Sequence, residues 1–392
     1  MGRVDDAERR ARLARRHLLA LTTGTDDVAR IADAVVALHS SDPVSVYLSV
    51  LARMHEPRLE AVDEALYVQR SVVRHHAMRR TLWVATPSTT RRMHAAATRK
   101  VAEAERRRTI VFLAAAGVPD PPHWLAQAKL AVVDLLHDHG PMTTREAGRH
   151  LPELTVPIMV GGPSGTGQSA HTRVLSGLGF DGVLVRTRPT GTWINGQYTW
   201  AVMDDWLPGG VDGLDEQEAQ RDLVAHYLQC FGPATSADLQ WWSGWTKTAT
   251  TRALSAAGAQ QVGTDAGPAW VAAGDTGAEP DSGPWVALLP GLDPTVMGWK
   301  ERSFYLPAAA APAWDRNGNA GPTIWVDGQV VGAWGQAKDG SIRTHYFLDV
   351  PAVRRAQVEQ RVGELRAILG PTRYAVRFPG AINARLLAGE PV

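Results

Sequence analysis

The N-terminal part of the chain has a hydrophobic pattern that predicts several helices followed by a hairpin. Apolar positions recur every three or four residues, as at Ile31, Val35 and Leu38, which is typical of amphipathic helices. Asp26 or Asp27 is expected to cap the second helix, and Asp42 before Pro43 to start the third. The predicted helices are Ala7–Leu21, Val28–Leu38, one from Pro43 through Leu48 and Leu59–Gln69, and two strands, Val72–Val73 and Thr81–Val84, flank the basic His75–Arg80. This order predicts a winged helix.

A similar order of elements follows twice more, which predicts internal repeats. In the second copy Gly161–Gly165 is expected to lead into the third helix, and the hairpin to be tipped by Arg188–Gly191. The stretch Phe231–Thr235 repeats the phrase His139–Thr143, so in both places Gly-Pro should end one helix and Thr should cap the next. The other elements predicted are helices at Trp124–Asp138, Arg145–His150, Thr166–Gly177 and Glu216–Tyr227, and strands at Val183–Arg186, Trp193–Asn195 and Tyr198–Val202.

The last part of the sequence is rich in predicted strands. Asp327-Gly328 between two β-rich runs is a strong hairpin signal. The strands are expected at Trp285–Leu289, Thr323–Val326, Gln329–Trp334 and Thr344–Phe347, with a loop at Ala272–Gly283 before them and a final helix at Val353–Leu369. We therefore expect an α+β fold with tandem winged-helix repeats in residues 1–118, 119–212 and 213–283, and a β-rich C-terminal region with its terminal helix in residues 284–392.

Composition narrows the class of protein. The chain has 392 residues, enough for more than one core, with 44% hydrophobic and 21% charged residues. No apolar run approaches the ~20 residues of a membrane span, and the charged N-terminus does not resemble a secretory signal. The single cysteine, Cys230, cannot form an internal disulfide, which suits a reducing cytoplasm. The 13 histidines include one His-x-His pair, His137 and His139, but no larger cluster, so neither a metal nor another cofactor is expected.

The charge is unevenly distributed although the net charge is only +1. The segment from Arg70 to Arg108 holds eleven Lys or Arg against two Glu, a charge of +9, which leaves about −8 for the rest of the chain. Such asymmetry indicates either a surface that binds a polyanion or a solvated helix face. Because Arg79 and Arg80 lie beside a predicted strand, we favour nucleic acid.

Several phrases spread along the chain support a family resemblance. They are Val35-Val36-Ala37-Leu38 with Asp42-Pro43, Met78-Arg79-Arg80-Thr81-Leu82, Phe231-Gly232-Pro233-Ala234-Thr235 with Trp241-Trp242-Ser243-Gly244, Leu288-Leu289-Pro290 with Asp293, and Trp325-Val326-Asp327-Gly328 with Trp334. Together they resemble the AlkZ-like family of winged-helix DNA glycosylases. The resemblance implies three tandem winged helices around a concave DNA-binding channel, and excision of N-alkylated purines, including bulky antibiotic adducts and interstrand crosslinks.

The resemblance also locates a candidate active site, with a departure from the family. The family usually has Gln-x-Gln, or Gln-x-Asp, immediately before Asp-Pro, and here those two positions hold His39 and Ser41. Either other side chains perform the same chemistry, or the protein binds DNA without cleaving it.

We call the segment from His39 to Asp42 the candidate corner. The reaction that the resemblance implies requires little catalysis from it. An N7-alkylated purine is already a good leaving group, so the site must mainly place a water and stabilise an oxocarbenium-like sugar. Neutral His39 could accept a proton from that water, since an unperturbed histidine pKa of ~6.5 is close to working pH. Ser41 could orient the water and Asp42 could supply negative charge. The structural alternatives are a hydrogen-bonded junction histidine, a turn serine and a helix cap.

The expected DNA contacts lie mostly in the second repeat. His171 and Arg173 fall on its third helix, and Arg186, Arg188 and Trp193 on or near its wing; Arg79 and Arg80 join them from the first. Surface salt bridges are the alternative for Arg173 and Arg186. We expect a monomer that acts on double-stranded DNA carrying alkylated purines. The rival hypothesis is a non-catalytic winged-helix protein, either a transcriptional regulator or a damage sensor.

Overall fold

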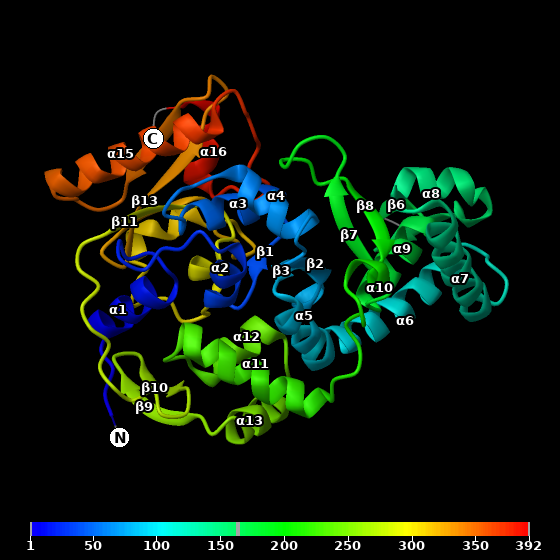
Figure 1. The fold of residues 1–392 in the computed structure, drawn as a ribbon, viewed down its shortest axis with the longest axis horizontal. Coiled ribbons are helices and arrows are strands. Elements are labelled where there is room, and N and C mark those ends of the chain that lie inside the picture. Colours follow the sequence, from blue (N-terminus) through cyan, green and yellow to red (C-terminus); the bar gives the residue numbers. More distant parts are fainter. Residues whose placement is uncertain (1, 162–164, 391–392) are drawn as a thin grey trace.

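The computed structural model describes residues 2–161 and 165–390, and these form a mixed α+β fold with five antiparallel sheets among the described residues. Figure 1 shows a larger part that holds both ends of the chain and a smaller part built around helices α6 to α9 and strands β7 and β8. Within the described ranges, no helix is long and apolar enough to cross a membrane.

The first helices begin where their capping residues predict. α1 (Asp6–Arg16), α2 (Val28–Ala34) and α3 (Pro43–Leu51) are capped by the side chains of Asp5, Asp27 and Asp42, and α4 (Leu59–Tyr67) follows. Each capping carboxylate accepts a hydrogen bond from a free amide of the first turn. The caps expected at Asp27 and Asp42 are therefore confirmed.

The predicted end of the second helix is wrong. α2 ends at Ala34, and Val36 has a left-handed backbone conformation with φ 61°. The chain then forms a two-residue strand, β1 (Leu38–His39), whose register pairs His39 with Trp83. The candidate corner is thus a strand-to-helix junction, because Val36 breaks the helical path within the spacing of Ile31, Val35 and Leu38.

The predicted hairpin is present and β1 extends it. β2 (Val73–His76) and β3 (Leu82–Ala85) flank the tip η1 (Met78–Arg80), and the sheet order is β1-β3-β2. The backbones of Arg79 and Arg80 are both left-handed, at φ 54° and 64°. Three helical segments that the pattern did not predict follow: α5 (Pro87–Met93), the π-helical η2 (His94–Thr98) and α6 (Arg99–Ala115).

The smaller part repeats helices and a hairpin. Its elements are α7 (Pro121–His139), β4 (Met142–Thr143), α8 (Thr144–His150), η3 (Pro152–Leu154), β5 (Pro157–Val160), β6 (Thr166–Ser169), α9 (Ala170–Phe180), β7 (Leu184–Pro189), β8 (Tyr198–Val202) and α10 (Met203–Trp206). The helix predicted from Thr166 begins only at Ala170, because Thr166–Ser169 pairs with β5. Trp193–Asn195, predicted as a strand, lies in the loop between β7 and β8. Residues 162–164 of the expected entry segment lie outside the described residues.

The Gly-Pro-x-Thr repeat is confirmed at both places. α7 ends at Gly140 and α11 (Glu216–Phe231) at Gly232, and Thr143 and Thr235 each cap the following helix in a reciprocal capping box. In the second place the helix that follows is α12 (Ser236–Ser243). α13 (Lys247–Ala256), β9 (Gln260–Thr264) and β10 (Gly267–Val271) complete this region.

A four-stranded antiparallel sheet forms the centre of the C-terminal region. Its order is β11 (Val286–Leu289), β12 (Thr323–Val326), β13 (Gln329–Gln336) and β14 (Ile342–Tyr346). Asp327 and Gly328 have positive φ at the β12–β13 turn, as their sequence predicts. The remaining elements are α14 (Pro294–Met297), η4 (Ala308–Ala313), the predicted final helix α15 (Ala352–Leu369) and a further helix, α16 (Ala381–Ala388).

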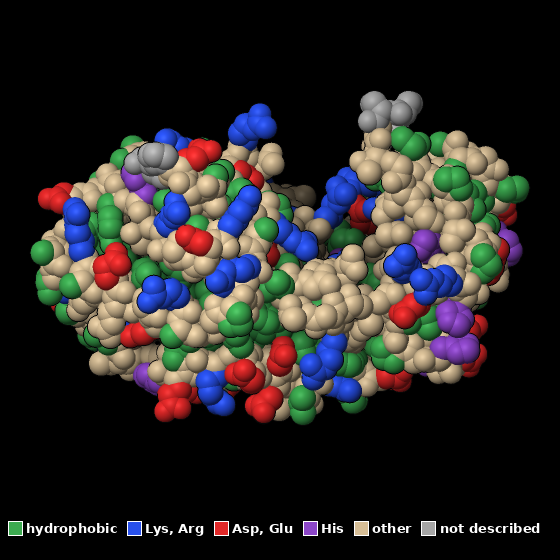
Figure 2. All heavy atoms as spheres, turned by 90° about the horizontal axis from the view of Figure 1, so that it is seen from above, with side chains coloured by type: hydrophobic (Ala, Val, Ile, Leu, Met, Phe, Trp, Pro, Cys, Tyr) green, Lys and Arg blue, Asp and Glu red, His purple; other side chains and the backbone are tan. Residues whose placement is uncertain are grey.

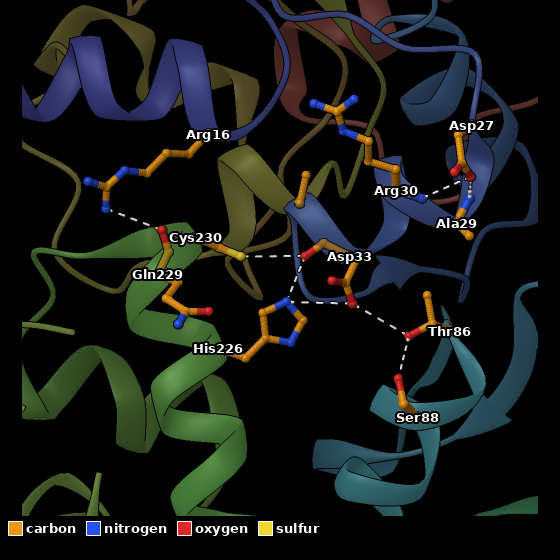
Figure 3. A pocket seen from close by; sticks show the side chains of 11 residues that line it. Arg16, Asp27, Ala29, Arg30, Asp33, Thr86, Ser88, His226, Gln229 and Cys230 are labelled. Atoms are coloured by element: carbon orange, nitrogen blue, oxygen red, sulfur yellow. Dashed lines mark hydrogen bonds and ion pairs between the residues drawn. The ribbon is translucent and has the colours of Figure 1, made fainter. Parts of the chain in front are cut away.

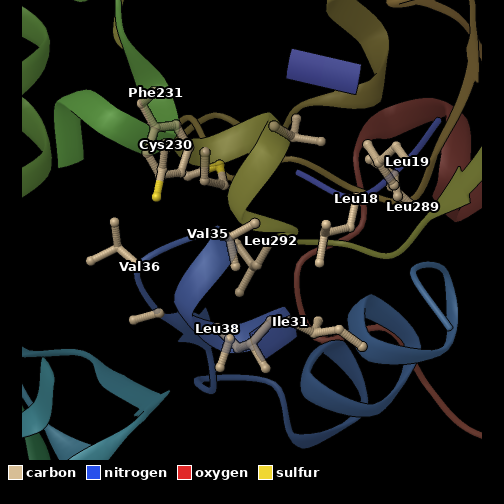
Figure 4. Close-up of a cluster of buried hydrophobic side chains, with 14 of the residues drawn as sticks. Leu18, Leu19, Ile31, Val35, Val36, Leu38, Cys230, Phe231, Leu289 and Leu292 are labelled. Carbon is tan, nitrogen blue, oxygen red and sulfur yellow. The ribbon is translucent and has the colours of Figure 1, made fainter. Parts of the chain in front are cut away.

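One large core joins regions far apart in the sequence. It unites side chains of α1 to α4 with α11, α12 and the C-terminal sheet, and Figure 4 shows Val35 and Leu292 between Leu38 on one side and Cys230 and Phe231 on the other. A separate core fills the smaller part, with members from Leu113 to Val202. The candidate corner is therefore part of the larger body, and burial of its apolar neighbours fixes its position.

Candidate functional site

His39 and Ser41 are brought together at the start of α3. The His39 side chain is buried, with the residue 5% exposed, and its ring lies 4.7 Å from that of Trp83. The Ser41 backbone amide donates to His39 Nδ1 across 3.4 Å. Because Nδ1 accepts this bond, its proton is assigned to Nε2, so His39 can offer an N–H donor but no lone pair at that atom.

Both residues line a cavity of about 340 Å³, which we call the corner cavity. Its walls come from β1, the tip of the β2–β3 hairpin, α12, the segment around α14 and the loop before α16. The lining residues are His39, Ser41, Arg79, Thr81, Trp241, Leu292, Met297, Lys300, Arg302, Asn317, Gly318, Asn319 and Phe378. Within the described chain, no carboxylate lines this space, and its volume suits a small organic group.

Burial changes the expected chemistry of His39. Loss of hydration, with a smaller contribution from nearby Arg79, lowers the pKa of His39 to about 3. The ring is therefore neutral at physiological pH and a poor proton acceptor. The sequence-based expectation of a base with a pKa near 6.5 is wrong for this environment.

The Asp42 carboxylate accepts hydrogen bonds from backbone amides of two segments. One carboxylate oxygen accepts from the Val44 amide at 3.2 Å and the other from the Arg377 amide at 3.1 Å. Burial raises the pKa of Asp42, while these hydrogen bonds oppose the change. Asp42 is not among the lining residues of the corner cavity. Although it follows Ser41 directly in the sequence, it does not form part of the cavity wall.

Three cationic side chains line the corner cavity without a carboxylate partner in the described part of the chain: Arg79, Lys300 and Arg302. The guanidinium carbons of Arg79 and Arg302 lie 4.5 and 5.2 Å from the ring centre of Trp241. Burial, and then the proximity of Arg302, lowers the pKa of Arg79. The Nε of Arg79 is buried without a hydrogen-bond acceptor.

Arg80 and Arg173, both predicted to contact DNA, are paired with the same carboxylate. Glu105 lies 2.8 Å from Arg80 and 2.7 Å from Arg173, and Arg108 also pairs with it. Burial opposes ionisation of Glu105, but the three arginines outweigh it and lower its pKa. The side chain of Arg173 is only 13% exposed. The salt-bridge alternative therefore describes its contacts.

His171 and Arg186 line a second space, a groove of about 1080 Å³ between α8 and strand β7. We call it the α8–β7 groove. It is rich in hydroxyl groups and also contains Arg145 and Arg149. Arg186 lies 4.8 Å from the Trp200 ring centre, its Nε is buried without an acceptor, and burial lowers its pKa to about 10.

Arg188 and Trp193 lie on or near the same hairpin. Arg188 is exposed, stacks 4.7 Å from the Tyr67 ring centre and has no ion-pair partner among the described residues. Trp193 lies between Tyr47, at 4.9 Å, and Tyr374, at 6.4 Å between ring centres. Trp193 therefore joins the hairpin loop to the larger part of the protein.

Residues 205–216 bind part of the basic segment Arg70–Arg108. Arg99 pairs with Asp212 and Lys100 with Glu216, while Arg91 donates to the Gly210 carbonyl. These two ion pairs neutralise only a small part of the charge asymmetry seen in the sequence.

A third cavity, of about 610 Å³, lies beside α2 and α11 (Figure 3). Its polar groups are mostly paired with one another: His226 Nε2 lies 2.8 Å from the Asp33 carbonyl, and the Cys230 thiol donates to the same oxygen. Burial raises the pKa of Cys230 to about 12, so the thiol is unreactive. We regard the smaller corner cavity as the candidate site because it brings His39 and Ser41 together with three cationic side chains that have no carboxylate partner among the described residues. Among the described residues, no cluster of three or more His, Cys, Asp or Glu could hold a metal.

Sequence reasoning missed three wall residues of the corner cavity: Trp241, Lys300 and Arg302. Trp241 stands in a phrase that the resemblance treats as scaffold, and its exposure to the cavity depends on how α12 packs against the hairpin tip. Lys300 and Arg302 are isolated in sequence, so no spacing signal marks them. Only the tertiary fold places them opposite His39.

Residues 32–368 match the family described as DNA glycosylase AlkZ-like. No curated protein matches the chain. Among solved structures, the Streptomyces sahachiroi DNA glycosylase AlkZ is similar in fold, with a TM-score of 0.73, 19% identity, and coverage of 96% of this chain and 99% of that chain.

Proposed function

We propose that this chain, which belongs to the AlkZ-like DNA glycosylase family, hydrolyses the N-glycosidic bond of N-alkylated purines and uses the corner cavity as its reaction site. One observation carries the proposal. His39 and Ser41, which replace the family's paired active-site residues, line one cavity together with an aromatic ring and unpaired hydrogen-bond donors. A base rotated out of the duplex needs such a space, because its glycosidic bond cannot be reached inside the stack.

The roles we assign differ from those of a general-base site. His39 donates from Nε2, either to the departing base or to an oxygen of the sugar-phosphate backbone. The Ser41 hydroxyl, which has no hydrogen-bond partner in the described chain, holds the water that attacks the sugar. Asp42 acts as a positioning residue, because it fixes the start of α3 and the segment at Arg377.

This division of labour suits a lesion that is already positively charged. N7 alkylation makes the purine a good leaving group, so departure requires neither a protonated acid nor a strong base. Positioning and electrostatic complementarity then supply most of the rate acceleration. We extend the substrate to bulky N7 adducts, including those of antibiotics and interstrand crosslinks, because the resemblance to the family implies such substrates and the wall of the corner cavity reaches from His39 and Ser41 to Trp241 and Phe378.

The duplex is proposed to lie along the α8–β7 groove. Figure 2 shows a hollow between the larger and smaller parts, with Lys and Arg side chains gathered along its walls. Arg186 and Arg188 would contact phosphates there, and the helix-plus-hairpin repeats would act as tandem winged helices around a channel. Contacts of this kind set affinity and orientation without reading sequence.

A second candidate function is supported by the absence of a carboxylate from the described cavity wall. Without one, the site has no fixed negative charge beside the sugar cation. A protein that recognises alkylated DNA without cleaving it would show the same cavity. A cleavage assay separates the two functions.

The test is strand scission at an abasic site. Duplex DNA with one N7-methylguanine, one bulky N7 adduct or one crosslink is incubated with the protein and then heated in alkali. We expect scission by the wild type and a loss of at least ~100-fold in His39→Ala and Ser41→Ala, in line with removal of a donor that acts in the transition state. His39→Gln, which keeps an N–H donor, should recover part of the rate.

Folding must be controlled because His39 is buried. His226→Gln alters a histidine of the separate cavity in Figure 3 and should leave scission unchanged. If wild type produces no abasic site from any of the three lesions yet binds them, the second function replaces the first.

A further inference from the structure

The corner cavity carries more positive charge than a glycosylase acting on a cationic base would need. Arg79, Lys300 and Arg302 line it, His39 offers a further N–H donor, and no described carboxylate faces them. An alkylated purine that carries a positive charge would meet only like charges. Like charges in a partly buried site repel strongly unless an anion lies between them.

The arrangement is also incomplete without an acceptor. Arg79 keeps its Nε buried with no hydrogen-bond partner, although burial of an unpaired donor is costly. The Nε of Arg302 donates to the Trp299 carbonyl at 2.9 Å. This bond helps to hold its guanidinium carbon 5.2 Å from the Trp241 ring centre. Two guanidinium groups are thus held over one aromatic ring.

We propose that Arg79, Lys300 and Arg302 form a binding site for one oxyanion inside the corner cavity. This inference rests on the proposed function and names the group that must accompany the lesion. The chemistry fits a phosphodiester, whose oxygens accept several charge-assisted hydrogen bonds from guanidinium and ammonium groups. A phosphate next to the lesion in the target strand is the source we favour, because every DNA substrate carries one; an acidic substituent on the adduct has the same chemistry.

The anion would have two effects. It would neutralise the three cations, so that a cationic purine can occupy the cavity. It would also hold the rotated nucleotide by its backbone while Ser41 and its water face the sugar. The site would therefore determine which substrates are held productively, which makes Lys300 and Arg302 positioning residues.

The experiment measures binding without turnover. The probe is a duplex with one N7-methyl-2′-fluoroguanine, in which the fluorine slows cleavage, and fluorescence anisotropy reports its affinity. A set of such duplexes carries a single neutral methylphosphonate at each phosphate in turn, on both sides of the lesion. The proteins are wild type, Lys300→Ala, Arg302→Ala, Arg302→Lys and Lys338→Ala, the last an exposed lysine outside the cavities described above.

We expect one methylphosphonate position to weaken wild-type binding, and this penalty to shrink by about fivefold or more in Lys300→Ala and Arg302→Ala. Arg302→Lys should retain part of it, and Lys338→Ala all of it. The salt slope of binding should also fall by roughly one unit per lost phosphate contact.

A second arm compares lesions with neutral and carboxylate-bearing N7 substituents of equal length on unmodified phosphates. A preference for the carboxylate that depends on Lys300 supports the oxyanion site with the adduct as its source. If neither arm depends on Lys300 or Arg302, or if Lys338→Ala behaves like them, the oxyanion site is disproved.

The two proposals fail separately. Scission in alkali with no coupling to Lys300 keeps the glycosylase and removes the oxyanion site. Coupling without scission keeps the oxyanion site in a protein that binds lesions and does not cleave them.

Discussion

Two hairpins of similar construction differ in whether all of their arginines remain without a carboxylate partner. The tip of the β2–β3 hairpin packs between α12 and α6, where Arg79 forms a cavity wall beside Trp241 and Arg80 pairs with Glu105. The β7–β8 hairpin holds Arg186 and Arg188 against aromatic rings, with no carboxylate partner among the described residues. Basic residues at a hairpin therefore do not by themselves indicate a nucleic-acid contact, because the neighbouring elements decide whether their charge is available.

The largest expected effect tests whether the two arginines of the β7–β8 hairpin bind DNA while the paired Arg80 of the β2–β3 hairpin does not. Arg186→Gln with Arg188→Gln should weaken duplex binding by tenfold or more and reduce the salt slope by roughly two units, one per phosphate contact. Arg80→Gln should leave both nearly unchanged, since its charge is already paired. Salt-dependent binding curves give both quantities, and equal losses in the two proteins would contradict the comparison.

Arg173 provides an intermediate effect of a different kind. Its guanidinium binds Glu105, whose side chain is only 3% exposed. Arg173→Gln should therefore lower the free energy of unfolding by about 2 kcal/mol, because a buried carboxylate loses a partner, while the salt slope of DNA binding stays the same.

Urea unfolding and salt titration separate these outcomes for Arg173. Arg107→Gln, which breaks an exposed pair with Glu103, should cost less than ~0.5 kcal/mol and serves as the control. A reduced salt slope with unchanged stability would return Arg173 to the DNA-binding surface.

A smaller effect concerns how stability depends on pH. It compares the buried His39 of the corner cavity with a histidine of the α8–β7 groove. The pKa of His39 is about 3 in the folded protein and ~6.5 when unfolded, so the unfolded state takes up a proton first as the pH falls. Stability should be unaffected by this group above pH ~6.5 and should decrease as the pH drops from there toward 3. In His39→Gln the loss between pH 7 and pH 5.5 should be smaller by about 1 kcal/mol.

The matched histidine is His171 in the α8–β7 groove. Burial lowers its pKa too, but it is more accessible, so His171→Gln should alter the pH dependence less. Urea unfolding at several pH values measures both. An equal change in the two variants would mean that the corner cavity is as hydrated as the groove.

The smallest expected effect concerns the excision rate, which should not change with pH near neutrality. Because His39 is neutral well below pH 6, the excision rate should stay level between pH 8 and pH 6. A rate that halves near pH 6.5 would show His39 acting as a base, as its sequence first suggested.

The sequence predicted the elements that local chemistry specifies. Asp27, Asp42, Thr143 and Thr235 cap helices because their side chains reach amides in the next turn, and Asp327-Gly328 forms its turn because both residues tolerate positive φ. These contacts span three or four residues. A pattern within one segment is enough to find them.

The features that the sequence did not predict depend on distant partners. Leu38 continues the helical spacing of Ile31 and Val35, yet its pairing with Val84 requires the chain to leave the helix before it, at Val36. The helix α6 was missed because its many basic residues were interpreted as a surface that binds a polyanion. Several of its charged residues form ion pairs within the protein. The walls of the corner cavity combine residues from 39 to 378, so no local pattern could assemble them.

The occupied Nδ1 of His39 has a consequence for undamaged DNA. Release of an ordinary adenine or guanine requires a proton donor for the departing ring, and His39 carries no extra proton at neutral pH while no described carboxylic acid lines the cavity. Discrimination would then be chemical rather than steric. If the corner cavity excises bases as proposed and Lys300 is held by the oxyanion, normal bases would enter and leave the site intact, and only bases that alkylation has already made labile would be lost from the genome.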